Sequence, residues 1–311
     1  MTTETAQRPT EAEAVVRRRA KPAMTVDRLQ RRVFGFLRWV VIAFFLIITL
    51  VPFYYMLLLS VKPIEALLRN PGSLIVSPSE FTLATYSQVL SSTATGGQGF
   101  GGLLANSAFV ALFSVALALL IGIPGAYAIA RLPFLGRRQV SGLFLAAYLF
   151  PAILMAIPLF VLFTRLGLRG SLIGLVLVYT AQTVPVAIYM LRNYFETVPV
   201  SIEEAGLVDG LGRLGVLRVI SLRLAMPSIM STGLFVFMIA WNEFLFALLF
   251  LVDRRERWTV SLGLSQLSGS VEIPTTVLMA GSVVLTLPII LMFFATERLL
   301  TGGLTAGAEK G

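Results

Sequence analysis

The sequence predicts an all-α membrane protein of six transmembrane helices, on the strength of its composition and its long apolar segments. Of its 311 residues, 57% are hydrophobic and only 13% are charged, whereas a soluble domain carries roughly 25% charged residues. Six apolar segments alternate with polar connections. Each is long enough to cross a hydrocarbon core of roughly 30 Å. An even number of spans places both termini on the same side of the membrane.

The expected spans follow a basic amino-terminal arm, residues 1–35, within a transmembrane domain of residues 36–300. They cover residues 39–61, 103–130, 140–164, 171–191, 227–252 and 275–296, and a short tail, residues 301–311, ends the chain. The arm and the apolar run after it are both too long for a cleaved signal peptide. The arm is interpreted as a disordered cytoplasmic tail or, over residues 26–36, as an interfacial helix on anionic lipid.

Basic residues set the expected orientation. The arm, the connection at Arg137 and Arg138, and the segment 192–223 all lie on one side of the predicted bundle. Cytoplasmic loops carry an excess of Lys and Arg, so this side is assigned to the cytoplasm. Three arginines in the outer turns run against the bias, but the arm outweighs them. We therefore expect both termini in the cytoplasm.

Missing residue types and motifs exclude several functions. The sequence contains no cysteine and no histidine, which removes disulfides, thiolate or imidazole metal sites and histidine-based catalysis. It contains no G-x-x-x-x-G-K-[ST] phosphate loop, so the chain is not expected to hydrolyse nucleotide itself. Its net charge of +9 is distributed around apolar spans rather than in one patch, which argues against nucleic acid. We therefore expect that the chain is not an enzyme and that it binds no cofactor.

The most informative polar segment lies between the fourth and fifth spans. Ser201 followed by Glu204 has the spacing of a capping box, which predicts the start of a short helix. Glu203 and Glu204 fall in its first turn, where negative charge complements the helix dipole. Gly206 and the Asp209-Gly210 pair are expected to end this helix within about two turns.

A second short helix is expected after this turn. Leu211, Leu214 and Leu217 would lie on one of its faces, with arginines elsewhere. The pattern indicates helix, sharp turn and helix on the water side of the membrane. An ordinary amphipathic loop helix would show the same pattern, so local physics alone leaves both interpretations open.

Polar residues inside the expected spans are candidates for a solute pathway or a gate. Asn242 and Glu243 lie in the fifth span, where an ionisable group costs about 2.5–3.5 kcal/mol at the bilayer centre and normally faces the bundle interior or water. Alternatively, Glu243 lies toward the outer end and pairs with a loop arginine. Gln182 in the fourth span is a weaker candidate. For Gln182, and for Asn106 with Ser107 in the second span, hydrogen bonding between helices is the favoured role.

The segment between the fourth and fifth spans resembles the EAA loop of binding-protein-dependent ABC importer permeases. That pattern stands here as Glu204-Ala205-Gly206, Asp209-Gly210, Ile220-Ser221-Leu222 and Pro227. The segments 194–199, 241–244 and 303–311 are similar to the carbohydrate branch, specifically its maltose-type second permease subunit. Gly206 replaces the second alanine of the motif, and Arg223 stands where the family often has proline.

The resemblance implies a type I ABC importer permease bundle in a bacterial or archaeal cell membrane. It implies a heterodimer with a second permease subunit, two cytoplasmic subunits that bind ATP and magnesium, and an extracytoplasmic solute-binding protein. The EAA loop, residues 194–226, would couple the bundle to an ATPase. The residues implied in this coupling are Glu203, Glu204, Ala205, Gly206, Leu207, Asp209, Gly210 and Leu211. The tail would reach between the ATPases.

The implied substrate is a di- or oligosaccharide such as maltose or trehalose, with glycerol phosphate or glycerophosphodiesters as the alternative. A stand-alone secondary transporter is the rival from another class. Such transporters usually contain internal repeats and charged residues near the midplane, and the sequence shows no second copy of any segment. A membrane enzyme is disfavoured because histidine, cysteine and catalytic pairs are missing.

Overall fold

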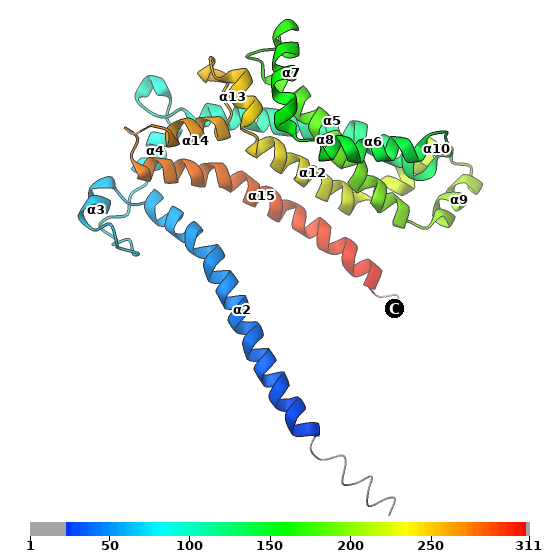
Figure 1. The fold of residues 1–311 in the computed structure, drawn as a ribbon, viewed down its shortest axis with the longest axis horizontal. Helices are drawn as coiled ribbons and strands as arrows, with labels where there is room; N and C mark the ends of the chain where they lie inside the picture. Colours follow the sequence, from blue (N-terminus) through cyan, green and yellow to red (C-terminus); the bar gives the residue numbers. More distant parts are fainter. Residues whose placement is uncertain (1–22, 271, 309–311) are drawn as a thin grey trace, which may run out of the picture. The chain divides into compact units, whose positions relative to one another are not determined.

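A computed structural model describes residues 23–270 and 272–308, and these residues form helices joined by turns (Figure 1). They belong to two compact units that divide between Met56 and Leu57. The prediction of an all-α chain is confirmed over the described residues, where no strand is found. Most of the arm, residues 1–22, and the chain end, residues 309–311, lie outside the described residues.

The first unit is built from helix α2, Ala23–Ser60, with Pro52 inside it, although the last four residues of this helix belong to the second unit. Residues 30–60 are apolar and long enough to cross a membrane, and almost all of the large side chains in this stretch are exposed. The expected first span is therefore present as a helix. Residues 26–36 form its first turns instead of a separate interfacial helix.

The second unit contains the remaining helices, which Figure 1 colours from light blue to red. They are α3 Ile64–Arg69, α4 Ala84–Leu90, α5 Phe100–Arg131, α6 Arg137–Leu149, α7 Ala152–Arg165, α8 Leu172–Thr197, α9 Val200–Val208, α10 Arg213–Val216, α11 Leu222–Leu224, α12 Met226–Asn242, α13 Leu245–Leu251, α14 Val260–Ser268 and α15 Thr275–Ala308. Short 3-10 segments η1 Thr93–Thr95 and η3 Arg255–Arg257 and a π-helical segment η2 Leu217–Ser221 complete it.

Helices α5, α8 and α12 form the centre of this unit. α5 and α8 pack along each other, α12 lies against both, and α15 lies against α12. Ala118, Ala187 and Val236 meet at the centre of the three-helix contact. Small side chains let membrane helices approach closely, and a Cβ at Gly122 would lie 3.3 Å from the Cβ of Ala187.

Two of the expected spans are not straight. Residues 140–164 form α6 and α7, which meet at an angle of 91°. Pro151 lies at the bend, and a residue before proline is restricted to extended backbone, as Phe150 is here. Residues 227–252 form α12 and α13, separated by Glu243 and Phe244. In the described part, four helices qualify as spans. The count reaches the predicted six only if two bent pairs are each one span, and these pairs are α6 with α7 and residues 213–224 with α12.

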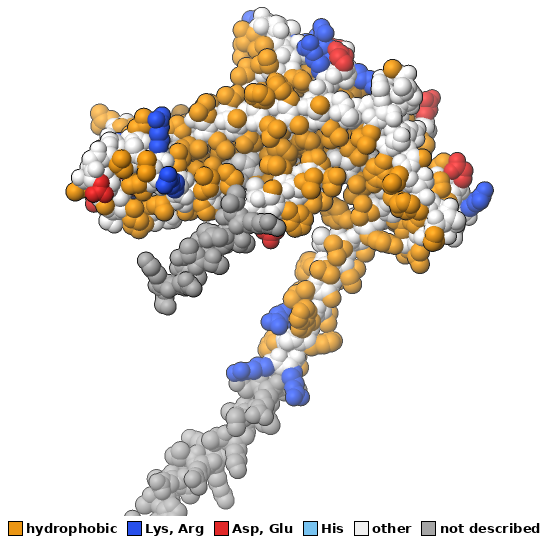
Figure 2. Space-filling model, turned by 180° about the vertical axis from the view of Figure 1, so that it is seen from behind, with side chains coloured by type: hydrophobic (Ala, Val, Ile, Leu, Met, Phe, Trp, Pro, Cys, Tyr) orange, Lys and Arg blue, Asp and Glu red, His pale blue; other side chains and the backbone are white. Residues whose placement is uncertain are grey.

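The surface of the described part agrees with a lipid-facing protein. Apolar side chains cover most of the face shown in Figure 2, and charged side chains on it are few. Large exposed apolar residues occur on α5, α6, α7 and α15, among them Leu120, Leu143, Ile157 and Phe294. Exposed apolar area of this extent requires a non-aqueous neighbour.

Candidate functional site: the α9 loop and the helix break at Glu243

The N-cap of helix α9, Val200–Val208, lies two residues earlier than the sequence predicted. Its N-cap is Pro199, with φ −58° and ψ 127°, and no side chain caps it. The predicted capping box between Ser201 and Glu204 is therefore wrong, because both residues lie inside the helix. Proline cannot cap through a side chain, but its fixed φ and missing N–H suit the start of a helix.

The end of α9 is a Schellman turn. Gly210 adopts φ +88°, a left-handed conformation that costs about 1–2 kcal/mol for most other residues. Its N–H donates to the carbonyl of Leu207 at 3.1 Å, and the N–H of Leu211 donates to that of Gly206 at 3.0 Å. These two bonds define the motif. The predicted turn at Asp209-Gly210 is confirmed, whereas Gly206 does not end the helix but lies inside it.

The second short helix is present but irregular. α10 passes into η2 and α11 before the chain turns by 77° into α12. Leu211 precedes α10, Leu217 is buried, and Leu214 is 58% exposed. The sequence predicted these three leucines on one face of a single helix, but Leu211 lies outside α10, and Leu214 and Leu217 differ in burial.

A buried ion pair fastens α9 to α5. Arg131 Nε donates to Glu203 Oε1 at 3.1 Å, and the side chains are 8% and 7% exposed. The same carboxylate accepts from Ser221 Oγ of η2 at 3.0 Å and from the Tyr127 hydroxyl at 3.3 Å. Arg131 also donates to the carbonyl of Val198 at 2.6 Å. One carboxylate thus links α5, α9 and η2.

The resemblance implied Glu203 in coupling to an ATPase, but the structure gives its carboxylate an internal partner, Arg131. The sequence indicated an acidic first turn but not which of its two carboxylates points inward. Glu204 is the exposed one. The missed partner, Arg131, ends the second span, and its position directly after an apolar helix was the available signal.

Gly206 allows α9 to pack closely on η2. A Cβ at this position would lie 2.5 Å from Ile220 Cδ1 and 3.5 Å from Leu211 Cδ1 and Val216 Cγ2. Contact at 2.5 Å is well inside normal packing distances, so a larger residue requires Ile220 to move. The glycine that replaces the motif's alanine thus has a packing reason here.

The outer face of α9 is largely apolar. Ile202, Ala205, Leu207 and Val208 are all exposed, Val208 at 87%. Glu204 is exposed beside them. A short, fixed helix with an apolar face and an acidic side chain is suited to contact another protein, since the apolar core of an interface usually lies inside a polar rim.

Glu243 lies at the break between α12 and α13, toward the other end of the unit (Figure 1). Its carboxylate accepts from the N–H groups of Phe246 at 2.9 Å and Ala247 at 3.3 Å, and from the hydroxyl of Tyr179 on α8. Its backbone carbonyl accepts from Ser261 Oγ of α14 at 2.7 Å. Glu243 therefore caps α13 and joins three helices. The alternative pairing with a loop arginine is wrong in the described structure.

In the described residues, the other polar candidates form no hydrogen bond with the Glu243 side chain. Asn242 is exposed and donates to the carbonyl of Met238 at 2.9 Å. Gln182 is half-buried, and its Nε2 lacks a hydrogen-bond partner among the described residues. Asn106 donates to two carbonyls of the 256–258 loop at 3.0 Å, and Ser107 accepts from a backbone N–H at 2.8 Å. The last two side chains thus bind a loop and the start of α14.

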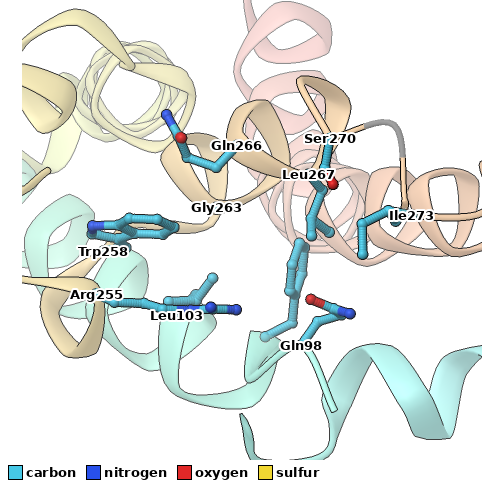
Figure 3. Close-up of a pocket in the computed structure, with 10 residues that line it drawn as sticks. Gln98, Leu103, Arg255, Trp258, Gly263, Gln266, Leu267, Ser270 and Ile273 are labelled. Atoms are coloured by element: carbon cyan, nitrogen blue, oxygen red, sulfur yellow. The ribbon is translucent and has the colours of Figure 1, made fainter. Parts of the chain in front are cut away.

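A pocket that the sequence did not indicate lies near α14 (Figure 3). Gln98, Arg255, Trp258 and Gln266 line it with polar groups and an indole ring, and Leu103 contributes apolar surface. The Arg255 guanidinium lies 5.7 Å from the centre of the Trp258 ring. Amide and guanidinium donors beside an aromatic ring can hold a polar, hydroxyl-bearing group.

Comparison with known proteins identifies the family. Residues 118–301 match the model of the binding-protein-dependent transport system inner membrane component. The chain therefore belongs to that family. It is 38% identical over 271 residues to the inner membrane ABC transporter permease protein YcjP of Escherichia coli, covering 87% of this chain and 94% of that one. The resemblance stated from the EAA motif is confirmed, and the permease is a multi-pass membrane protein and not itself an enzyme.

Two further relatives carry names that include a sugar. The permease is 36% identical over 266 residues to the trehalose/maltose transport system permease protein MalG of Thermococcus litoralis, covering 85% of this chain and 93% of that one. It is 34% identical over 264 residues to the trehalose transport system permease protein SugB of Mycobacterium tuberculosis, covering 84% and 93%.

A solved structure supports the fold. A chain of a bacterial ABC transporter involved in the import of the acidic polysaccharide alginate superposes with a TM-score of 0.72 at 24% identity, over 86% of this chain and 97% of that one. At this identity the likeness shows the fold, which is that of an ABC importer permease.

Proposed function

We propose that the permease forms half of the translocation pore of an ATP-driven importer for a di- or oligosaccharide such as maltose or trehalose. Its near full-length similarity to the trehalose/maltose permease of Thermococcus litoralis supports this substrate class. A second permease subunit supplies the other half of the pore, and an extracytoplasmic binding protein delivers the sugar. The chain has no phosphate loop, so ATP and magnesium bind to two partner ATPases in the cytoplasm.

In this proposal α9 is the element that receives movement from an ATPase. Its exposed apolar face, with Ile202, Leu207 and Val208, would occupy a cleft of that subunit, and Glu204 would meet a basic group at the rim. Leu211 and the Asp209-Gly210 turn fix the angle at which α9 is presented.

The buried ion pair between Glu203 and Arg131 attaches α9 to α5, so that the two helices are expected to move together. A displacement of α9 is then passed to α5 and to α8, which packs along it. A loop held only by exposed contacts would absorb the movement, whereas a buried, multiply bonded carboxylate transmits it as a rigid body. This contact is the main structural support for the coupling role.

The break at Glu243 is proposed to act at the gate of the solute pathway. The α12–α13 junction is a point at which a helix can change direction, and Glu243 holds it to Tyr179 of α8. Asn242 and Gln182 would face the solute at this level. The tail, residues 301–311, is proposed to reach between the ATPases.

Two loop variants test the coupling role in the complete complex. Gly210→Pro removes the left-handed turn and the bond to Leu207, and Glu204→Lys reverses the exposed charge. Both are expected to keep complex formation and ATP hydrolysis but to abolish sugar uptake. Gly212→Ala is the control, since Gly212 has φ −72° and open space around a Cβ. Normal uptake by both variants at normal complex levels would contradict the coupling role.

The substrate class is tested separately, with the wild-type complex in liposomes and its binding protein. Trehalose or maltose is expected to stimulate ATP hydrolysis and to accumulate inside, whereas glycerol 3-phosphate is not. Stimulation by glycerol 3-phosphate alone would contradict the sugar assignment while leaving the coupling role intact. Uptake by the permease without an ATPase would indicate a secondary transporter and contradict both.

A further inference from the structure

A pocket between α6 and α8 gathers arginines at the same end of the unit as α9. It is lined by Arg137, Arg138, Ser141, Leu145, Tyr189 and Arg192, among others. Two of these residues bear hydroxyl groups, and three bear guanidinium groups. The α6–α8 contact that forms it is the main packing contact of α6. The pocket is separate from the α9 surface and from the break at Glu243.

The charges at this pocket do not cancel. Arg192 pairs with Glu196 at 2.9 Å and also donates to Ser141. Arg137 lies 3.6 Å from the same carboxylate and donates to the carbonyl of Ala130 at 2.8 Å. Arg138 is exposed, and no ion pair is found for it in the described part of the chain. One carboxylate therefore pairs with two of the three guanidinium groups, which leaves a positive site with an unpaired donor.

The surroundings are apolar. Leu145 lines the pocket, and the α6 residues Leu143 and Leu149 are 68% and 69% exposed. A ligand here would thus meet positive charge at one end and an exposed apolar helix surface at the other. The arginine excess assigns this end to the cytoplasmic side, where the leaflet carries anionic lipid.

We propose that this pocket holds the phosphate group of an anionic phospholipid headgroup. Guanidinium groups recognise phosphate by paired, charge-assisted hydrogen bonds, and basic pockets between transmembrane helices on the cytoplasmic side bind such headgroups. Arg138 and Arg137 supply the charge, and the Tyr189 hydroxyl supplies a further donor. The acyl chains lie along α6. A soluble phosphate compound offers the same chemistry, but it would leave the apolar surface of α6 uncovered.

The test uses the full-length permease in neutral detergent and counts bound lipid by native mass spectrometry. Phosphatidylglycerol is expected to bind more tightly than phosphatidylcholine. Arg138→Gln should weaken phosphatidylglycerol binding about fivefold, the equivalent of about 1 kcal/mol for one basic residue near an anionic surface. Glu196→Gln should strengthen it, because the competing carboxylate is lost. Arg223→Gln, an exposed arginine at the same end outside the pocket, is the control.

Three results would overturn the proposal. Equal binding of the two lipids would show that charge is not recognised. Equal loss in Arg138→Gln and Arg223→Gln would show a diffuse effect of net charge. Displacement of phosphatidylglycerol by millimolar inorganic phosphate, in the wild type but not in Arg138→Gln, would assign the pocket to a soluble phosphate compound instead of a lipid. Because Arg138 is exposed, its variant is expected to fold normally, and an unchanged melting temperature checks this.

Discussion

Replacing Glu203 with alanine is expected to lower the free energy of unfolding of the permease by about 3–5 kcal/mol, the usual effect of removing one partner of a buried ion pair. Arg131 is only 8% exposed. In the variant its guanidinium would keep the carbonyl of Val198 but lose its counter-charge. The hydroxyls of Tyr127 and Ser221 would lose their acceptor as well.

The double variant Arg131→Met/Glu203→Met separates the pair from its surroundings. Both charges are gone, so no uncompensated ion remains, and the double variant is expected to recover at least about 2 kcal/mol of the loss. Denaturant titration of the detergent-solubilised permease measures both values. Glu204→Ala, at the exposed neighbour, should change stability by less than about 0.5 kcal/mol. A double variant no more stable than Glu203→Ala would refute the buried-pair reasoning.

Three further predictions concern contacts elsewhere. Gly206→Ala requires Ile220 to move, because the Cδ1 of that residue would lie 2.5 Å from the new Cβ, and this strain offsets the gain of about 1 kcal/mol in helix propensity that alanine brings. Adding Ile220→Val, which removes that atom, should therefore raise the stability above that of Gly206→Ala in the same titration, and no gain would contradict the close contact. Glu243→Ala should lower the free energy of unfolding by about 1–3 kcal/mol, since it uncaps α13 and leaves the Tyr179 hydroxyl unpaired. Tyr179→Phe in that background should recover part of the loss. Strictly additive effects of the two substitutions would contradict the hydrogen bond between these side chains. Asn106→Leu should lower the free energy of unfolding by about 1–2 kcal/mol, because the carbonyls of Glu256 and Trp258 lose their hydrogen-bond donor. Limited proteolysis should then cut the 256–258 loop faster than in the wild type.

The sequence predicted the helices well where one physical signal dominated. Uncharged apolar runs long enough to cross a bilayer appear as α5, α8 and α15, and all three begin near the predicted positions. α5 also ends near the predicted residue, whereas α8 continues to Thr197 and α15 to Ala308, past the predicted ends at 191 and 296. The turn at Gly210 was also predictable, because Asp-Gly is typical of a position that needs a left-handed residue.

The sequence was less informative where several weak signals competed. Apolar runs do not reveal bends, so the 91° angle before Pro151 and the break at Glu243 appeared as continuous spans. The start of α9 followed Pro199 instead of Ser201, because a proline that fixes its own φ competes with a side-chain cap. Which carboxylate is buried depends on Arg131, more than 70 residues earlier, and no local pattern contains that information.

The two acidic residues of α9 therefore have different physical roles, although they are neighbours. Glu203 is held inside by α5 and η2, and Glu204 is free to face a partner. Because α9 is attached to α5 and η2 on its inner face, a force on its outer face is expected to move these elements with it. The strength of the inner attachment then limits how much movement can be transmitted. Loss of transport in Glu203→Ala with retained ATPase binding, and recovery in the Met/Met double variant, would connect the stability of this pair directly to coupling.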